Sequence, residues 1–273
     1  MSSKVTIPAL QQMKNDARKI VGVVVWDYQM ARIVDRVGVE IMSVGDSVGI
    51  NLWGQPNPLE VTMEQMLTVT QAVRRGTKNA LLSCDFPYGP LQEGTDAAVA
   101  AAIRFVKEAG VDLIKLDGAA DYPEAVTALT RAGIPVWAQF GITPQTALQY
   151  GIDYAAMSSA TVTADMQERL VAEAKMLEAA GAVLLDFTNS GPVIGPIVAA
   201  AVSIPVIGGF GGGPWLDGRV RMAHAAIGYS EKHLDSDIET YANVAKTSLD
   251  ALTAFSEDVR AGRQIKGAPK GKK

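Results

Sequence analysis

The stretch ALLSCDFPYGPLQEGTDAAVAAAIRFVKEAGVDLIKLDG, residues 80–118, decides the fold. It opens with the apolar run ALLSC (80–84), continues through a helical pattern that stops at Gly110, and closes with a second run, LIKL (113–116). Glycine is the usual residue at the left-handed stop of a helix. Both strand-like runs are continuous rather than alternating, which is typical of parallel strands buried on both faces. The stretch therefore predicts a strand–helix–strand unit.

The same unit recurs along the chain. Further strand-like runs lie at residues 20–25, 40–45, 135–140, 182–187 and 205–210, and a weaker one lies at 218–222. Helical patterns lie between many of these runs, among them residues 63–76, 95–110, 122–133 and 164–181. Repeated strand–helix units form either an open, doubly wound sheet or a closed barrel. The near-even spacing of the runs favours an α/β fold of the (β/α)8, or TIM barrel, type over the open sheet.

The end of the chain adds a helical pattern and a basic tail. Residues 234–260 predict an amphipathic helix after the barrel, and residues 260–273 hold six Lys or Arg and no acid. Such a tail can bind nucleic acid. The whole chain has a net charge of −4, however, so the body sums to −10, and Gly and Pro interrupt the tail. A flexible, solvated end at 261–273 is therefore favoured, and in the absence of a Pro- or Ser-rich linker we expect one domain over residues 1–273.

Composition excludes several classes of protein. Hydrophobic residues make up 48% of the chain and charged residues 20%, which is ordinary for a globular protein and excludes a disordered or fibrous one. One cysteine and two histidines exclude a Cys-based zinc cluster and a His-rich metal site. No apolar run approaches the roughly 18 residues of a membrane span, and the N-terminus lacks a signal-peptide pattern. We therefore expect a cytoplasmic protein with neither a membrane nor a nucleic acid as partner.

Acidic residues stand where the strand-like runs stop, which in a barrel of this kind is the edge that carries the active site. They are Asp27, Asp46, Asp85, Asp117 and Asp186. Carboxylates brought so close together repel one another, and a divalent cation removes that penalty. Asp46, Asp85 and Asp117 supply the oxygen ligands that suit Mg2+ or a similar ion. The alternative is that each caps the helix that follows, but three on consecutive strand ends favour the metal site.

Lys115 lies two residues before Asp117, so the two side chains face the same side of the strand. Lysine is rarely buried without a partner. One interpretation is a structural ion pair with an aspartate. The other is that Lys115 binds a substrate carboxylate or stabilises an enolate.

Two further motifs have less specific interpretations. The loop GGFGGGP (208–214) follows the seventh run, where barrels often bind phosphate, although close packing explains the glycines equally well. Cys84 directly precedes Asp85 with no activating group beside it in the sequence, which favours a buried, inert thiol.

Several segments together resemble one enzyme family. They are DYQMARIVDRVGVEIMSVGDSVG (27–49), CDFPYG (84–89), AGVDLIKLDG (109–118), AGIPVWAQFGITPQ (132–145) and, more loosely, AGAVLLDF (180–187) and IPVIGGFGGGPWLDGRV (204–220). Their order and spacing resemble the ketopantoate hydroxymethyltransferase (3-methyl-2-oxobutanoate hydroxymethyltransferase) family. That family belongs to the phosphoenolpyruvate mutase/isocitrate lyase superfamily of (β/α)8 barrels. The resemblance implies a homo-oligomer, typically a decamer.

The resemblance also implies an activity and roles for individual residues. Asp46 and Asp85 match metal-binding aspartates of the family, and Asp117 stands where the family usually has a glutamate that faces the metal. Ser47 and Lys115 match residues that hold the carboxylate of the 2-oxo-acid. The implied reaction transfers a hydroxymethyl group from 5,10-methylenetetrahydrofolate to 3-methyl-2-oxobutanoate and gives 2-dehydropantoate, in pantothenate biosynthesis. The metal, with Mg2+ expected, and Lys115 would stabilise the enolate.

The chain departs from the family pattern at three places. The catalytic glutamate of the family is Asp186 here, its usual histidine is Gln139, and its K-x-Q-G-R-type segment is not recognisable in residues 154–163. These changes indicate a divergent member and keep two alternatives open. One is aldol addition or cleavage of a different 2-oxo-acid through the same enolate chemistry. The other is a barrel that has lost catalysis and serves in assembly or binding.

Overall fold

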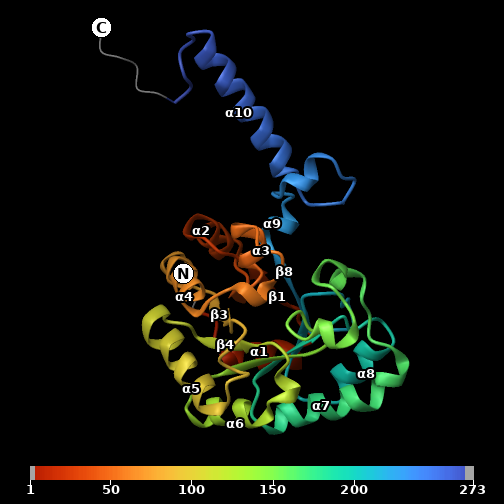
Figure 1. Ribbon diagram of the computed structural model, residues 1–273. Coiled ribbons are helices and arrows are strands. Elements are labelled where there is room, and N and C mark those ends of the chain that lie inside the picture. Colours follow the sequence, from red (N-terminus) through yellow and green to blue (C-terminus); the bar gives the residue numbers. More distant parts are fainter. Residues whose placement is uncertain (1–3, 268–273) are drawn as a thin grey trace. The chain divides into compact units, whose positions relative to one another are not determined.

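The structure, a computed structural model, describes residues 4–267. Eight parallel strands pair in chain order into a closed barrel, with helices around it, which confirms the predicted (β/α)8 fold (Figure 1). The strands are β1 (Ile20–Val24), β2 (Ile41–Val44), β3 (Leu81–Asp85), β4 (Leu113–Leu116), β5 (Val136–Gly141), β6 (Leu184–Thr188), β7 (Val206–Gly208) and β8 (Gly218–Met222). Every predicted strand-like run therefore contains a strand.

The helices between the strands follow the predicted patterns closely. They are α2 (Tyr28–Val37), α3 (Val48–Trp53), α4 (Met63–Gly76), α5 (Thr95–Arg104), α6 (Pro123–Arg131), α7 (Gln167–Ala179) and α8 (Ile194–Ala200). Helix α4 begins where the sequence predicts, because Thr62 and Gln65 form a capping box at its start. The pattern at 95–110 divides into α5 and a π-helical turn, η2 (Phe105–Ala109), and stops at Gly110, whose φ is +65°.

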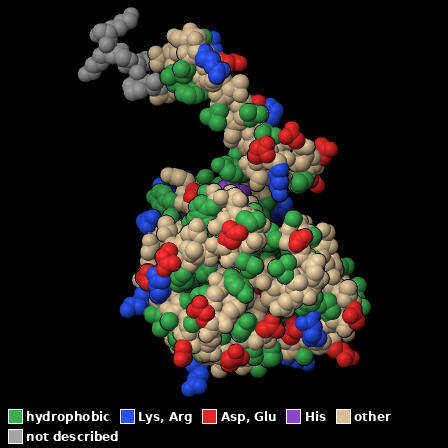
Figure 2. All heavy atoms as spheres, in the orientation of Figure 1, with side chains coloured by type: hydrophobic (Ala, Val, Ile, Leu, Met, Phe, Trp, Pro, Cys, Tyr) green, Lys and Arg blue, Asp and Glu red, His purple; other side chains and the backbone are tan. Residues whose placement is uncertain are grey.

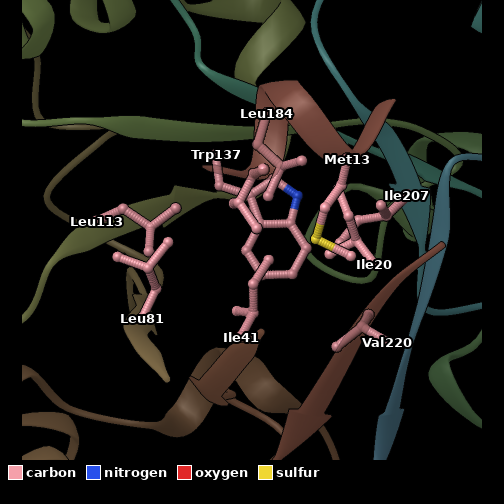
Figure 3. Close-up of a cluster of buried hydrophobic side chains, with 10 residues drawn as sticks. Met13, Ile20, Ile41, Leu81, Leu113, Trp137, Leu184, Ile207 and Val220 are labelled. Atoms are coloured by element: carbon pink, nitrogen blue, oxygen red, sulfur yellow. The ribbon is translucent and has the colours of Figure 1, made fainter. Parts of the chain in front are cut away.

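An apolar plug fills one end of the barrel. Helix α1 (Ile7–Asn15) contributes Leu10 and Met13 to a cluster of buried side chains from the first residues of most strands. Figure 3 shows Met13 among them. The buried cluster is Leu10, Met13, Ile20, Ile41, Leu81, Leu113, Trp137, Leu184, Ile207 and Val220. Because this end is filled by hydrocarbon, the polar side chains of the strands collect at the opposite, carboxyl-terminal end.

A second compact unit begins at Met222. Its described part holds α9 (Ala223–Ala226), a 3-10 turn η7 (Glu231–Leu234) and α10 (Val244–Arg260). The predicted helix at 234–260 is wrong in its first part, because Asn243 caps α10 by accepting a hydrogen bond from the Lys246 backbone N–H at 2.9 Å. The single-domain boundary stays a prediction. Of the predicted tail at 261–273, residues 268–273 lie outside the described residues.

Helix α10 carries an exposed apolar face, whose side chains are visible along it in Figure 2. Leu249, Leu252, Phe255 and Val259 recur at helical spacing and are 49–65% exposed. Among residues 4–267, no helix combines the length and the apolar character that crossing a membrane requires.

Candidate active site

The structure brings the predicted site residues together at the carboxyl-terminal end of the barrel. Asp85, Lys115 and Asp186 lie on β3, β4 and β6, Asp117 directly follows β4, and Asp46 lies two residues after the end of β2. The residue exposures are 7% for Asp46, 9% for Asp85, 8% for Lys115, 6% for Asp117 and 1% for Asp186. A group of one ammonium and four carboxyls is thus largely withdrawn from water.

Ser47 lies at the start of α3 and is half-buried. The chain before it must turn tightly, because a Cβ on Gly45 would lie 2.9 Å from Ser47 Oγ and 3.0 Å from Val24 Cγ1. Glycine at position 45 therefore lets Asp46 and Ser47 approach β1 and β3 closely.

Lys115 joins two of the carboxylates. Its Nζ lies 3.5 Å from Asp85 Oδ2 and 3.2 Å from Asp186 Oδ2. The same ammonium lies 5.3 Å from the centre of the Trp137 ring, within the range of a cation–π contact. The ion pair considered as one interpretation of Lys115 is therefore formed, and it leaves Lys115 at the centre of the site.

Gln145 also belongs to the site, and sequence reasoning missed it. Its side-chain amide Nε2 donates to Asp46 Oδ2 at 2.9 Å and to the Phe86 carbonyl at 3.0 Å, and its backbone N–H donates to Asp117 Oδ2 at 3.2 Å. Gln145 is not among the polar residues at the ends of the strand-like runs, because it lies beyond the end of β5 at Gly141. Its one sequence signal is that it lies in a loop at the same end of the barrel.

The charges of the site are strongly coupled. Burial, together with the charges of Asp85 and Asp117, raises the pKa of Asp46 to about 8. Burial raises the pKa of Asp117 to about 7 and also raises that of Asp85, although the Lys115 ammonium opposes the shift at both. Burial would lower the pKa of Lys115, but the carboxylates of Asp85 and Asp186 outweigh it and raise that pKa. Without a further cation, Asp46 and Asp117 therefore tend to retain protons near neutral pH.

Helix capping explains only one of the strand-end acids. Asp27 caps α2 by accepting a hydrogen bond from the Met30 backbone N–H at 2.9 Å. Asp46 and Asp117 instead receive hydrogen bonds from Gln145 in the loop after β5, and Asp85 receives one from Lys115 on β4. The capping alternative thus holds for Asp27, and these three carboxylates need another explanation.

The carboxylates supply oxygen donors for a divalent cation, but they do not stand in a ready-made metal site. Across residues 4–267, no three His, Cys, Asp or Glu side chains already stand in the arrangement of a metal site. Asp85 Oδ1 and Asp117 Oδ1 are nevertheless buried without a hydrogen-bond partner, and such oxygens call for a ligand. Magnesium is often bound by one or two carboxylates with water and substrate oxygens, so this donor set fits it. The metal set of Asp46, Asp85 and Asp117 stays a prediction.

Two of the departures from the family pattern are neighbours. Gln139 on β5 is the register partner of Asp186 on β6, and both are buried. Gln139 Nε2 donates to Thr188 Oγ1 at 2.9 Å. An amide thus stands beside a carboxylate at the two positions where the family resemblance led us to expect a histidine and a glutamate.

The Gly-rich loop packs against the end of β6. The Gly209 backbone N–H donates to Asp186 Oδ1 at 3.3 Å, and the Asn189 backbone N–H donates to the Phe210 carbonyl at 2.9 Å. A Cβ on Gly211, whose φ is +62°, would lie 3.0 Å from Asn189 Cα. Close packing therefore accounts for this glycine, while the phosphate interpretation stays a prediction.

Tyr154 opens the segment that lacks the K-x-Q-G-R pattern. Its ring meets that of Phe210 edge-on, with 6.2 Å between the ring centres. Burial, and then the negative charges of Asp46, Asp117 and Asp85, raise the pKa of its hydroxyl. Tyr154 and Phe210 thus form an aromatic pair between the loops after β5 and β7.

Cys84 is buried on β3, and its Sγ lies 3.2 Å from Thr70 Oγ1. Burial raises the pKa of its thiol well above the usual value. The predicted burial of this thiol is confirmed.

Solved structures share the fold over nearly the whole chain. A 2,3-dimethylmalate lyase, described as a PEP mutase/isocitrate lyase superfamily member, matches with a TM-score of 0.60 and 15% identity, over 98% of this chain and 92% of that chain. A phosphonopyruvate hydrolase in complex with oxalate and Mg2+ matches with a TM-score of 0.57 and 14% identity, over 98% and 92% of the two chains. At these identities the likeness establishes the fold alone.

Sequence relatives are much more similar. The 3-methyl-2-oxobutanoate hydroxymethyltransferase of Cyanothece sp. is 39% identical over 94% of this chain and 96% of its own length. The enzyme of the same name from Pyrococcus abyssi is 38% identical over 90% of this chain and 84% of its own length. The family model for ketopantoate hydroxymethyltransferase matches residues 4–264. The chain thus belongs to the ketopantoate hydroxymethyltransferase family.

Proposed function

We propose that this protein is an enzyme that transfers a hydroxymethyl group from 5,10-methylenetetrahydrofolate to 3-methyl-2-oxobutanoate, giving 2-dehydropantoate for pantothenate biosynthesis. Family membership supports the activity. The observation that carries it is the position of Lys115, whose Nζ lies within 3.5 Å of Asp85 and 3.2 Å of Asp186 at the barrel end where such enzymes act.

Asp46 and Asp85 would hold a divalent cation, expected to be Mg2+, and Asp117 would face it directly or through water. The unpartnered Asp85 Oδ1 and Asp117 Oδ1 support this assignment. When bound, the cation would supply Lewis acidity that favours an enolate at the 2-oxo group.

Lys115 and Ser47 would bind the substrate carboxylate, since both stand at the rim beside the aspartates. Lys115 would also offset the negative charge that develops as the substrate loses a proton. Asp186, within 3.2 Å of that ammonium, would accept the proton from C3 of the 2-oxo-acid. The electrons of the broken C–H bond form the enolate.

The enolate carbon then bonds to the one-carbon unit of the folate. The two bonds from this carbon to the folate nitrogens break, and one water supplies its hydroxyl oxygen. The carbon thereby becomes the hydroxymethyl group of the product, and tetrahydrofolate is released. The protein's task is to hold the two reactants in line, because the folate itself carries the carbon at the required oxidation level.

A second candidate is aldol addition or cleavage of a different 2-oxo-acid. The adjacency of Gln139 and Asp186 favours it, because an amide and a shortened carboxylate stand where the family has a histidine and a glutamate. This reaction would use the same enolate with another acceptor.

We further propose that the protein acts as a cytoplasmic homo-oligomer, a decamer by family resemblance. The exposed apolar face of α10 supports an assembly, because monomers rarely expose contiguous apolar surface of this kind. Neither nucleic acid nor a membrane is a proposed partner.

Hydrogen exchange tests the proposal most directly. The protein is incubated with 3-methyl-2-oxobutanoate and Mg2+ in D2O, and loss of the C3 proton is followed by NMR. We expect metal-dependent exchange in the wild-type protein and none in Asp85→Ala. Addition of 5,10-methylenetetrahydrofolate should then give 2-dehydropantoate, whereas exchange without this product supports the second candidate. Full exchange by Asp85→Ala would refute the metal assignment.

A further inference from the structure

We infer that Gln145 is a positioning residue for the divalent cation: its side-chain amide holds the Asp46 carboxylate, and its backbone N–H holds that of Asp117, in the orientation that the cation requires. This inference rests on the proposed function and extends it to a residue with no assigned role. Gln145 would not contact the cation or the substrate. It would act through the two carboxylates.

The hydrogen bonds of Gln145 fix its amide group in one orientation. Nε2 has two hydrogens, and it donates to two acceptors, Asp46 Oδ2 at 2.9 Å and the Phe86 carbonyl at 3.0 Å. A flipped amide would place Oε1 against the Phe86 carbonyl, which can only accept, and against the Asp46 carboxylate, which can only accept once it is ionised. The amide therefore tethers the end of β2 to the end of β3.

The same residue reaches a third strand end through its backbone. The Gln145 N–H donates to Asp117 Oδ2 at 3.2 Å. Its turn is held by a hydrogen bond between Thr143 Oγ1 and Thr146 Oγ1, which lie 2.8 Å apart, and it runs close to Gly118, where an added Cβ would lie 3.0 Å from Thr146 Cγ2. The donors of Gln145 are thus fixed relative to the loop that carries Asp117.

The pattern of occupied and free oxygens supports a role in metal binding. Gln145 contacts Oδ2 of both Asp46 and Asp117, and Asp117 Oδ1 is buried without a hydrogen-bond partner. Asp85 Oδ1 is buried in the same state. Donors on one oxygen of a carboxylate orient the other, and groups that orient ligands in this way typically change metal affinity by about 10- to 100-fold when removed.

The test is a direct measurement of Mn2+ binding. Gln145→Met keeps the length of the side chain and the backbone donor to Asp117, and it removes only the two amide donors. The dissociation constant of Mn2+ is measured for the full-length wild-type and variant proteins by electron paramagnetic resonance of the free ion, without substrate. We expect binding by Gln145→Met to be weaker by about 10- to 100-fold, with an unchanged circular dichroism spectrum. In the exchange assay, we compare two fold-changes of Gln145→Met relative to the wild type. The fold increase in the Mn2+ concentration that gives the half-maximal rate should exceed the fold decrease in the rate at saturating Mn2+.

Gln149→Met is the matched control, because Gln149 is an exposed glutamine that follows closely in the chain; its Mn2+ affinity should equal that of the wild type. If Gln145→Met does not fold, the Mn2+ affinity of Gln145→Ala is measured instead. Wild-type affinity in a folded Gln145 variant overturns the inference and leaves the proposed function standing. Failure of the wild-type protein itself to bind Mn2+ overturns both.

Discussion

Lys115 Nζ lies 3.2 Å from Asp186 Oδ2, so an ion pair connects β4 with β6 at the mouth of the barrel. Both side chains are buried, with exposures of 10% and 2%. Asp186 also accepts the Gly209 backbone N–H at 3.3 Å. Asp186 is not part of the proposed metal set, and the ion pair holds its carboxylate beside Lys115, the residue proposed to bind the substrate. A base for the C3 proton is needed at this place.

The length of the side chain at position 186 should decide the rate of the reaction. Asp186→Asn removes the base while keeping the shape, and we expect proton exchange to fall by at least about 100-fold, the usual contribution of a positioned base. Asp186→Glu restores the family's longer carboxylate and should preserve or raise turnover, since errors of about 1 Å in placement can cost about 100-fold. NMR exchange rates and product formation measure both variants. Wild-type exchange by Asp186→Asn would assign the proton transfer to another group.

Loss of the ammonium should destabilise the protein as well as inactivate it. Lys115→Met leaves Asp85 and Asp186 buried without their shared cation. Breaking a buried ion pair from one side typically costs about 3–5 kcal/mol, and we expect the free energy of unfolding in urea to fall by that order in EDTA. Mg2+ should restore part of the stability without restoring exchange. A Lys115→Met protein as stable as the wild type would show that the pair adds nothing to folding.

The stability of the metal-free protein should fall as the pH rises from about 5 to 8. The pKa of Asp46 is raised to about 8 and that of Asp117 to about 7, whereas an unfolded aspartate has a pKa of about 4. Between these values the folded state binds more protons than the unfolded state, so raising the pH favours unfolding, by about 1.4 kcal/mol per pH unit for each retained proton.

Thermal unfolding in EDTA and in Mg2+ measures this dependence. A cation displaces the retained protons, so Mg2+ should stabilise the protein more at pH 8 than at pH 6. Asp46→Asn should flatten the slope in EDTA. A metal-free protein whose midpoint rises over this range would contradict the burial of protonated aspartates.

The barrel and the convergence of its acids were predictable because both depend on local pattern. A strand such as β4 (Leu113–Leu116) is recognisable as a short, mostly apolar run, and the place where the run stops puts Lys115 and Asp117 at the carboxyl end of the strand. Closure of the barrel then brings Asp46 and Asp186 to the same rim without further information. The sequence pattern also predicted α4 to the residue, since its cap and its periodicity agree.

Gln145 and Tyr154 were not predictable in the same way. Both lie between β5 and α7, where the chain forms only the short turns η4 (Ala147–Tyr150), η5 (Tyr154–Ser159) and η6 (Ala164–Met166). Such turns have no apolar periodicity to set the direction of a side chain. Their contacts with Asp46 and Phe210 depend on the path of the loop over the barrel, which tertiary packing determines.

The apolar face of α10 should mediate assembly of the chain. Leu252→Glu combined with Phe255→Glu places two charges on a face whose side chains are at least 49% exposed. Burial of that face against a second copy would then be opposed by desolvation of both charges, and we expect a smaller species by sedimentation velocity. Ala254→Glu, an exposed position on the opposite face of the helix, should leave the assembly intact. An unchanged sedimentation coefficient in the double variant would show that α10 lies outside the subunit interface, because neither charge could then be buried there.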